Sequence, residues 1–266
     1  MVFEFDFRDE KLISEYSLKD LYDVLFSGTA VVMSDFDGTI YRGEPFILRY
    51  SQSSPFDLEK RLVFQNPLKA AKFTLKNLGS IVNIMYHQDS PELFAIVESF
   101  ANDLLKGYKI DYLKSISTDL IRNIYGSSVK VIKKMAPSEV NIISRGYSFL
   151  HKPLEEMLNC EVKDYSNNLK SEHGTVFGID NSKLVKDTKD KMIAVEDIVS
   201  RNNDSILVCF GNTPGDLEAY EPARKTGHTI TIGIGKYLKD YDVVAESWHS
   251  ILHIVYENIL TRKKHF

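Results

Sequence analysis

The chain has 266 residues, of which 43% are hydrophobic, 26% charged and 11% aromatic. This composition is typical of globular proteins with one large domain or two, and it excludes disordered, collagen-like and membrane classes. The net charge of -4 provides no positive field for nucleic acid or an anionic membrane, so we expect neither as a partner.

The N-terminal residues lack the basic start and apolar stretch of a signal peptide, which predicts a cytoplasmic protein.

The first predicted elements are a helix and a buried strand. Apolar residues at mixed helical spacings predict a helix over about residues 11–26. The apolar run Ala30–Met33 then opens into the polar stretch Ser34–Thr39. This pattern is typical of a buried strand that ends in a loop.

Residues 41–125 have a different character. Pro55, Pro67 and Pro91 each follow Ser or Asn, and a proline after such a cap marks the start of a helix. Gly79 and Gly107 are suitable helix ends. Apolar residues between these signals recur every three or four positions. We therefore predict an all-helical insert over 41–125.

After Gly126 the chain alternates between helices and strands. Helices are predicted at about 127–135, 147–158 and 188–200, and strands at 140–143, 160–162, 175–177, 205–210, 229–232 and 243–244. This alternation predicts an α/β fold with a Rossmann-like parallel sheet and helices on both faces. Residues 1–40 and 126–266 would form this core, and 41–125 would form a separate domain.

Polar residues follow three of the predicted strands. Asp35 and Asp37 follow the first, Ser144 the second, and Asn212 with Asp216 the strand that ends at Phe210. The carboxyl ends of parallel strands meet at one edge of a sheet, so these side chains should converge. Two such carboxylates can bind Mg²⁺ and supply a nucleophile and an acid/base.

The motifs at these strand ends resemble those of the haloacid dehalogenase (HAD) superfamily. The run Asp35-Phe36-Asp37-Gly38-Thr39-Ile40 resembles its first motif, and Ile142–Tyr147, with Ser144, its second. Gly211–Asp216 resembles the fourth motif, Gly-Asp-(Ser/Gly)-x-x-Asp, but has Asn212 in place of the first aspartate. For the lysine of the third motif, the sequence context favours Lys189, with Lys191 as the alternative.

The resemblance covers residues 30–40 and 126–245 and extends to the phosphoserine phosphatase-like branch through the Ser-x-Gly-aromatic run at Ser144–Tyr147. It implies that the insert is a C1-type helical cap that selects the substrate. Glu44 stands nine residues after Asp35, where this branch has a glutamate that contacts the substrate's amino group; the alternative is an exposed loop acid. The implied substrate-binding residues are Gly38, Thr39, Glu44, Arg145 and Gly146.

The implied function is Mg²⁺-dependent hydrolysis of a small phosphorylated metabolite, similar to phosphoserine. Asp35 would be the nucleophile and Asp37 the general acid and base, while Ser144 and Lys189 would bind phosphate. Mg²⁺ would be held by Asp35, Asp37, Asn212 and Asp216. Because Asn212 brings no negative charge, a weakly active or inactive protein that binds a phosphometabolite is an alternative. A phosphotransferase is another, and the oligomeric state is open.

Overall fold

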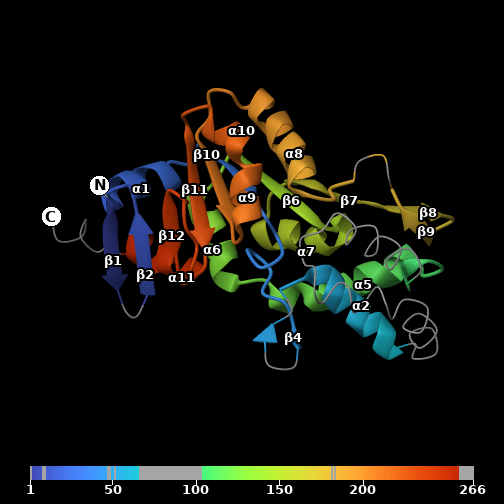
Figure 1. The fold of residues 1–266 in the computed structure, drawn as a ribbon. Helices are drawn as coiled ribbons and strands as arrows, with labels where there is room; N and C mark the ends of the chain where they lie inside the picture. Colours follow the sequence, from blue (N-terminus) through green and yellow to red (C-terminus); the bar gives the residue numbers. More distant parts are fainter. Residues whose placement is uncertain are drawn as a thin grey trace.

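The computed structural model describes residues 2–7, 10–46, 49–50, 52–65, 104–180, 182 and 184–257. An eight-stranded sheet forms its centre (Figure 1). In spatial order the strands are β1 (Phe3–Phe7), β2 (Glu10–Ser14), β12 (Val243–Ala245), β11 (Thr229–Ile234), β10 (Leu207–Gly211), β3 (Val31–Ser34), β6 (Glu139–Tyr147) and β7 (Val162–Asn167). The strands from β12 to β7 run parallel, and the β1–β2 hairpin joins β12 antiparallel.

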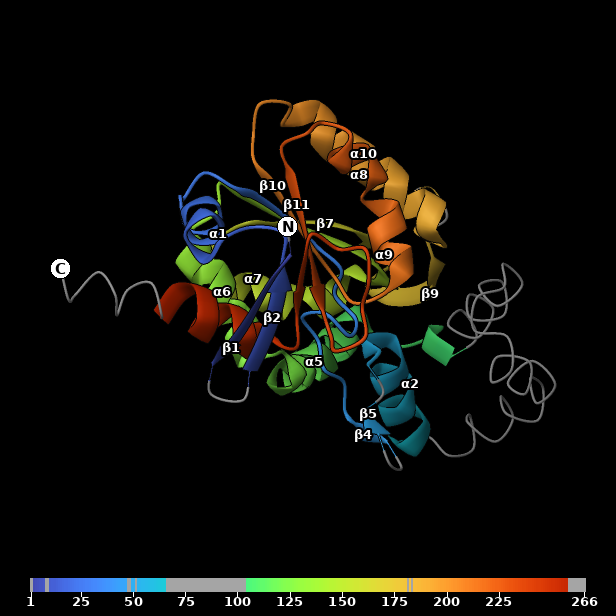
Figure 2. The same ribbon diagram turned by 60° about the vertical axis from the view of Figure 1, so that its left-hand side comes forward.

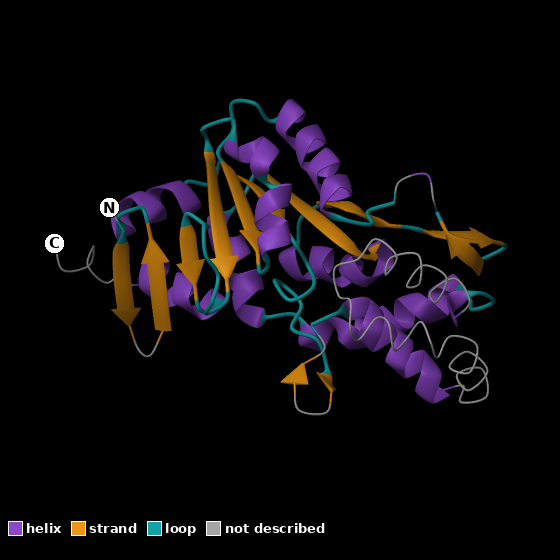
Figure 3. Ribbon diagram, in the orientation of Figure 1, coloured by secondary structure: helices purple, strands orange, loops and turns teal. Residues whose placement is uncertain are grey.

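Helices cover both faces of this sheet (Figures 2 and 3). One face carries α8 (Thr188–Arg201), α9 (Pro214–Ala219) and α10 (Glu221–Arg224). The other carries α1 (Leu18–Leu25), α6 (Gly126–Met135), α7 (Ser148–Leu158), α11 (Trp248–Ser250) and the π-helical segment η3 (Ile251–Glu257). No helix in the described part of the chain has both the length and the apolar character that crossing a bilayer requires.

The central strand β3 is buried on both sides, which explains its unbroken apolar sequence. Val31 and Met33 pack with Val195 of α8, whereas Val32 belongs to the larger apolar cluster that includes Leu21 of α1. Successive side chains of a strand point to opposite faces, so one short run contributes to both cores. The predicted α/β fold with a largely parallel sheet is confirmed.

The helix predicted over 11–26 is wrong for its first part. Residues 10–14 form β2, in which Leu12 and Ser14 are buried and Ile13 is exposed. This alternation has the period of a strand, and Leu12 pairs with Ala245 of β12. The helix itself begins after Ser17, whose hydroxyl accepts a hydrogen bond from the Asp20 N–H group.

The described part of the insert contains α2 (Ser54–Gln65), α5 (Ile110–Leu120) and the 3₁₀ turn η1 (Ile121–Asn123). It also contains a hairpin of β4 (Pro45–Phe46) and β5 (Arg49–Tyr50), so the all-helical prediction is wrong there. Pro45 disfavours helix in the residue before it, and aromatic residues favour strands. The predictions made from Pro67, Gly79 and Pro91 lie outside the described residues. That 41–125 is a separate domain stays a prediction.

A second hairpin extends from the core towards the insert. It consists of β8 (Leu169–Glu172), which the sequence analysis missed, and β9 (Thr175–Ile179). The Val176 N–H group donates to the Tyr108 carbonyl at 2.9 Å, and the Gly107 N–H group donates to the Val176 carbonyl at 2.8 Å. These main-chain bonds tie the hairpin to the segment that leads into α5.

Candidate active site

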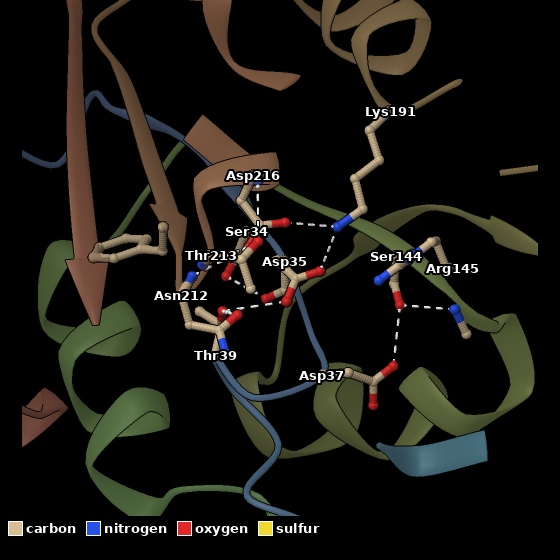
Figure 4. Close-up of polar contacts among 12 residues, drawn as sticks. Ser34, Asp35, Asp37, Thr39, Ser144, Arg145, Lys191, Asn212, Thr213 and Asp216 are labelled. Carbon is tan, nitrogen blue, oxygen red and sulfur yellow. Dashed lines mark hydrogen bonds and ion pairs between the residues drawn. The ribbon is translucent and has the colours of Figure 1, made fainter. Parts of the chain in front are cut away.

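The ends of three neighbouring strands bring Asp35, Asp37 and Ser144 of the predicted catalytic residues together (Figure 4). Asp35 follows β3, Ser144 lies in the last part of β6, and Asn212 follows β10. The Tyr220 hydroxyl donates to the Phe210 carbonyl at 2.7 Å and accepts from the Asp35 N–H group at 3.1 Å. This tyrosine, which carries no motif, fixes the backbone of Asp35 against β10.

The Asp35 carboxylate is buried, with 6% of the residue exposed. Its Oδ1 accepts from Lys191 Nζ at 2.7 Å, and its Oδ2 lies 3.2 Å from Thr39 Oγ1. Burial and the neighbouring Asp216 charge raise the pKa of Asp35 to about 7, against the opposing effect of Lys191. Among the described residues, Oδ1 thus has a cationic partner, whereas the hydrogen-bond partner of Oδ2 is a neutral hydroxyl group.

Lys191, and not Lys189, is the lysine of this site. Its Nζ lies 2.7 Å from Asp35 Oδ1 and 2.7 Å from Asp216 Oδ1. Burial acts to lower the pKa of Lys191, but the two carboxylates raise it above its ordinary value. Lys189 is exposed, so the preference for Lys189 is corrected. The two positions differ because residues two apart point to different sides of a helix.

Asp216 holds the loop after β10 in place. Its Oδ2 accepts from the N–H groups of Asn212 and Thr213 at 3.2 and 3.1 Å and from Thr213 Oγ1 at 2.8 Å. Burial acts to raise the pKa of Asp216, but Lys191 and these donors hold it below its ordinary value. Both carboxylate oxygens therefore already have protein partners. Asn212 Oδ1 lies 3.1 Å from Thr39 Oγ1.

Gly38 allows the conformation of the loop that follows β3. Its φ of +84° lies in the left-handed region, and a β-carbon there would stand 2.2 Å from Asn212 Nδ2. The absence of a side chain therefore allows the loop after β3 to approach the loop after β10.

Asp37 lies beside Ser144 and the start of α2. Its Oδ1 accepts from the Ser54 N–H group at 2.6 Å, and its Oδ2 lies 3.4 Å from Ser144 Oγ. Gly146 donates its N–H group to Ser144 Oγ at 2.9 Å. Burial raises the pKa of Asp37, although the Ser54 N–H group opposes this effect. A carboxyl group that keeps its proton to higher pH is suited to general acid catalysis.

Glu44 is engaged elsewhere. It forms an ion pair with Lys60 at 2.8 Å and binds Arg61, whose Nε lies 3.1 Å away. Burial opposes the shift, but Arg61 and Lys60 lower the pKa of Glu44 to about 2. In the described part of the chain its ion-pair partners are thus Lys60 and Arg61 of α2 and Arg122 of η1, none of which belongs to a motif. The structure also places Arg145 on the surface, with its main-chain carbonyl bound by Asn167 Nδ2 at 2.7 Å.

Two ionisable side chains near the site had no sequence signal. His151 of α7 is buried, and its Nε2 has no hydrogen-bond partner among the described residues. Glu59 of α2 has a buried Oε1 that likewise lacks a partner in the described part of the chain. Burial raises the pKa of Glu59 to about 8. Neither stands in a recognisable motif, because each depends on a helix packing against the end of β6.

The comparison with known proteins identifies the fold. No protein-family profile and no curated protein matches the sequence. A cytosolic 5'-nucleotidase IIIB, solved with cytidine, aligns with a TM-score of 0.63 and 14% identity over 92% of this chain and 91% of its own. A substrate-bound phosphoserine phosphatase aligns with a TM-score of 0.51 and 17% identity, over 85% of this chain and 98% of its own.

A HAD family hydrolase from Salmonella enterica serovar Typhi aligns with a TM-score of 0.56 and 14% identity, over 86% of this chain and 72% of its own. This chain therefore has the fold of HAD hydrolases, as the motifs implied. At these identities the likeness establishes the fold alone.

Proposed function

We propose that this protein hydrolyses a small phosphorylated metabolite through an aspartyl-phosphate on Asp35, with Mg²⁺ as its cofactor. The observation that carries the proposal is the position of Asp35. It is buried at the end of β3 with Oδ1 bound by Lys191 at 2.7 Å, and Asp37 stands two residues away in a fold shared with phosphatases.

In the first half-reaction Asp35 Oδ1, the oxygen next to Lys191, attacks phosphorus and the bond to the leaving oxygen breaks, while Oδ2 is left for the metal ion. The Asp37 carboxyl group gives its proton to that oxygen, so the product leaves as an alcohol. The Lys191 ammonium and the Ser144 hydroxyl would bind phosphoryl oxygens and stabilise their charge. In the second half-reaction Asp37 takes a proton from water as the water attacks phosphorus, which releases phosphate and restores Asp35.

The residues present fit Mg²⁺ by the chemistry of their donors. Asp35 Oδ2 and Asn212 Oδ1 lie 3.2 and 3.1 Å from the same atom, Thr39 Oγ1, and both are the hard oxygen ligands that Mg²⁺ prefers. We propose that they hold the ion with the Asp37 main-chain carbonyl. Asp216 would become a further ligand only after one of its carboxylate oxygens is released from its present hydrogen bonds. When bound, Mg²⁺ neutralises charge on the transferring phosphoryl group.

The substrate is proposed only as a class. In a phosphoserine-like complex an acidic side chain would pair with the amino group, but Glu44 is already neutralised by Lys60 and Arg61. We therefore do not extend the proposal to phosphoserine. The neighbours in fold include a 5'-nucleotidase and a phosphoserine phosphatase. The substrates that these two names imply share only a small phosphate ester, so the proposal stops at that class.

The experiment is release of phosphate from p-nitrophenyl phosphate, O-phosphoserine and a 5'-nucleotide, with Mg²⁺ or with EDTA. We expect turnover that requires Mg²⁺ and is abolished in Asp35→Asn, because the amide is a poor nucleophile. The matched control is Asp204→Asn, since Asp204 is an exposed aspartate, and it should behave as wild type. Turnover that survives in Asp35→Asn would contradict the assignment of Asp35 as the nucleophile. No turnover in wild type would contradict the proposed hydrolysis and favour the non-catalytic binding role that Asn212 suggests.

A further inference from the structure

A buried histidine, His151, lies close to Asp37, the proposed general acid and base. His151 of α7 is 1% exposed, and its ring packs on Phe36, the residue between Asp35 and Asp37, with centroids 4.2 Å apart. Its Nδ1 lies 2.9 Å from Asp164 Oδ2. Asp164 is in turn bound by the Ser166 hydroxyl. Phe36 and Asp164 therefore hold the ring in place, and the remaining polar atom of the ring is Nε2.

Nε2 of His151 is a buried atom that lacks a hydrogen-bond partner among the described residues. Leaving such an atom unpaired costs about 1–3 kcal/mol, so each case needs an explanation. Because Nδ1 faces a carboxylate, it carries a proton, and Nε2 is either an acceptor or the second donor of an imidazolium. Burial acts to lower the pKa of His151, but Asp164 raises it overall.

Gly146 relates this atom to groups of the proposed site. A β-carbon on Gly146 would stand 3.3 Å from His151 Nε2, 3.1 Å from Asp37 Oδ2 and 3.1 Å from Ser144 Oγ. These three polar atoms thus surround one point above the bare α-carbon of Gly146. A side chain at position 146 would occupy that point, so glycine leaves room for Asp37 and His151 to approach each other.

We propose that His151 is a positioning residue for Asp37: held by Asp164, it shares a hydrogen bond through Nε2 with the Asp37 carboxyl group when that group turns from Ser54 towards the leaving oxygen. Such a bond would be available to both forms of Asp37. A neutral Nε2 accepts from the protonated carboxyl group, and an imidazolium donates to the carboxylate. His151 would keep Asp37 aimed at the leaving oxygen throughout turnover, and this inference rests on the proposed function.

The test uses the leaving group. A p-nitrophenolate departs readily without a proton, whereas an alkoxide needs one, so a defect that acts through Asp37 must be larger for alkyl phosphates. His151→Asn can keep the Asp164 contact but does not reach the Nε2 position, and His151→Gln places an amide nitrogen near that position. We compare both with wild type on p-nitrophenyl phosphate and on the faster of O-phosphoserine and the 5'-nucleotide.

We expect His151→Asn to lower kcat for the alkyl ester roughly 10- to 100-fold, with KM little changed and with a loss of about threefold or less for p-nitrophenyl phosphate. His151→Gln should recover most of the loss. Equal losses on both esters, or none, would overturn the inference while wild-type turnover upholds the proposed function. A wild-type protein without turnover would contradict both the proposed function and this inference. If His151→Asn does not fold, Asp164→Asn, which leaves His151 in place, should show the same selectivity for the alkyl ester.

Discussion

At the scale of single residues, Lys191 balances two buried negative charges. Its Nζ is 2.7 Å from both Asp35 and Asp216, so Lys191→Met would leave two carboxylates close together with no cation between them. Removing one partner of a buried ion pair costs about 3–5 kcal/mol, and we expect a loss of that size in urea unfolding at pH 8. Phosphate release should also fall to background.

The matched control for this substitution is Lys189→Met. Lys189 lies two residues away in α8 and is exposed, so stability should change by less than about 0.5 kcal/mol and activity should remain. Equal effects of the two substitutions would contradict the assignment of Lys191 to the site.

Glu59 predicts a pH-dependent stability. Burial raises its pKa from 4.5 to about 8, so the unfolded chain releases this proton at lower pH than the folded protein does. Glu59 therefore destabilises the fold increasingly as pH rises from about 4.5 to 8. Glu59→Gln removes this cost, and we expect it to stabilise on the order of 3 kcal/mol at pH 9 and much less at pH 5.5.

Urea unfolding at the two pH values measures this difference. Glu156→Gln, at an exposed glutamate of α7, is the control for the loss of one negative charge. If Glu59→Gln and Glu156→Gln shift stability alike at both pH values, then Glu59 is not held in a desolvated position.

The choice of the wrong lysine shows which sequence signal was missed. Matching the local sequence to a motif favoured Lys189, but the periodicity of α8 identifies its inner face. Lys191 lies three, four and seven residues before Ala194, Val195 and Ile198, which are all buried, so these residues share one side of the helix. A lysine on an apolar stripe must meet a buried negative charge. His151 gave no comparable signal, because its partners come from β6, β7 and the loop after β3.

At the scale of elements, the loop after β3 was predictable from the sequence. How closely this loop approaches the loop after β10 depends on Gly38. Gly38→Ala would place a β-carbon 2.2 Å from Asn212 Nδ2 at a φ of +84°. The control is Gly107→Ala, where φ is +88° and nothing lies within 4 Å. Strain in the left-handed region costs about 1 kcal/mol in both proteins.

The clash with Asn212 is particular to Gly38→Ala, so we expect it to lose at least about 2 kcal/mol and most of its activity. Thermal unfolding and phosphate release measure the two effects. A Gly38→Ala protein no worse than Gly107→Ala would mean that the two loops do not approach as closely as the structure shows.

The elements that sequence patterns predicted best are those whose apolar residues fit only one kind of secondary structure. Strand β10 is buried along its whole length, from Leu207 to Gly211, and α8 has one apolar stripe, so both stand out from their neighbours. Strand β2 has apolar residues at positions 12 and 13 that suit a helix equally well. Its pairing on one side with β1, and on the other with β12, where Leu12 lies opposite Ala245 more than two hundred residues away in the chain, makes it a strand.

At the scale of the whole molecule, segments near the two ends of the described chain meet beside the loop after β3. The hydroxyls of Ser247 and Ser250 both donate to Glu10 in β2, at 2.8 and 2.6 Å. Between them in sequence, Trp248 is 1% exposed and donates from Nε1 to the Thr39 carbonyl at 2.8 Å. The segment after β12 therefore supports the loop that carries Asp35 and Asp37.

Trp248→Phe keeps an aromatic ring against Phe210, whose ring centroid lies 4.5 Å from that of Trp248, but it removes the donor to Thr39. An unpaired buried carbonyl costs about 1–3 kcal/mol, and the smaller ring adds a cavity term of similar size. We expect a loss of about 3 kcal/mol in urea unfolding, together with a lower kcat, because Thr39 Oγ1 lies 3.2 Å from Asp35. His249→Ala, at the exposed next residue, should change neither. A Trp248→Phe protein that is destabilised but keeps its full kcat would show that the C-terminal segment supports the fold without positioning the loop.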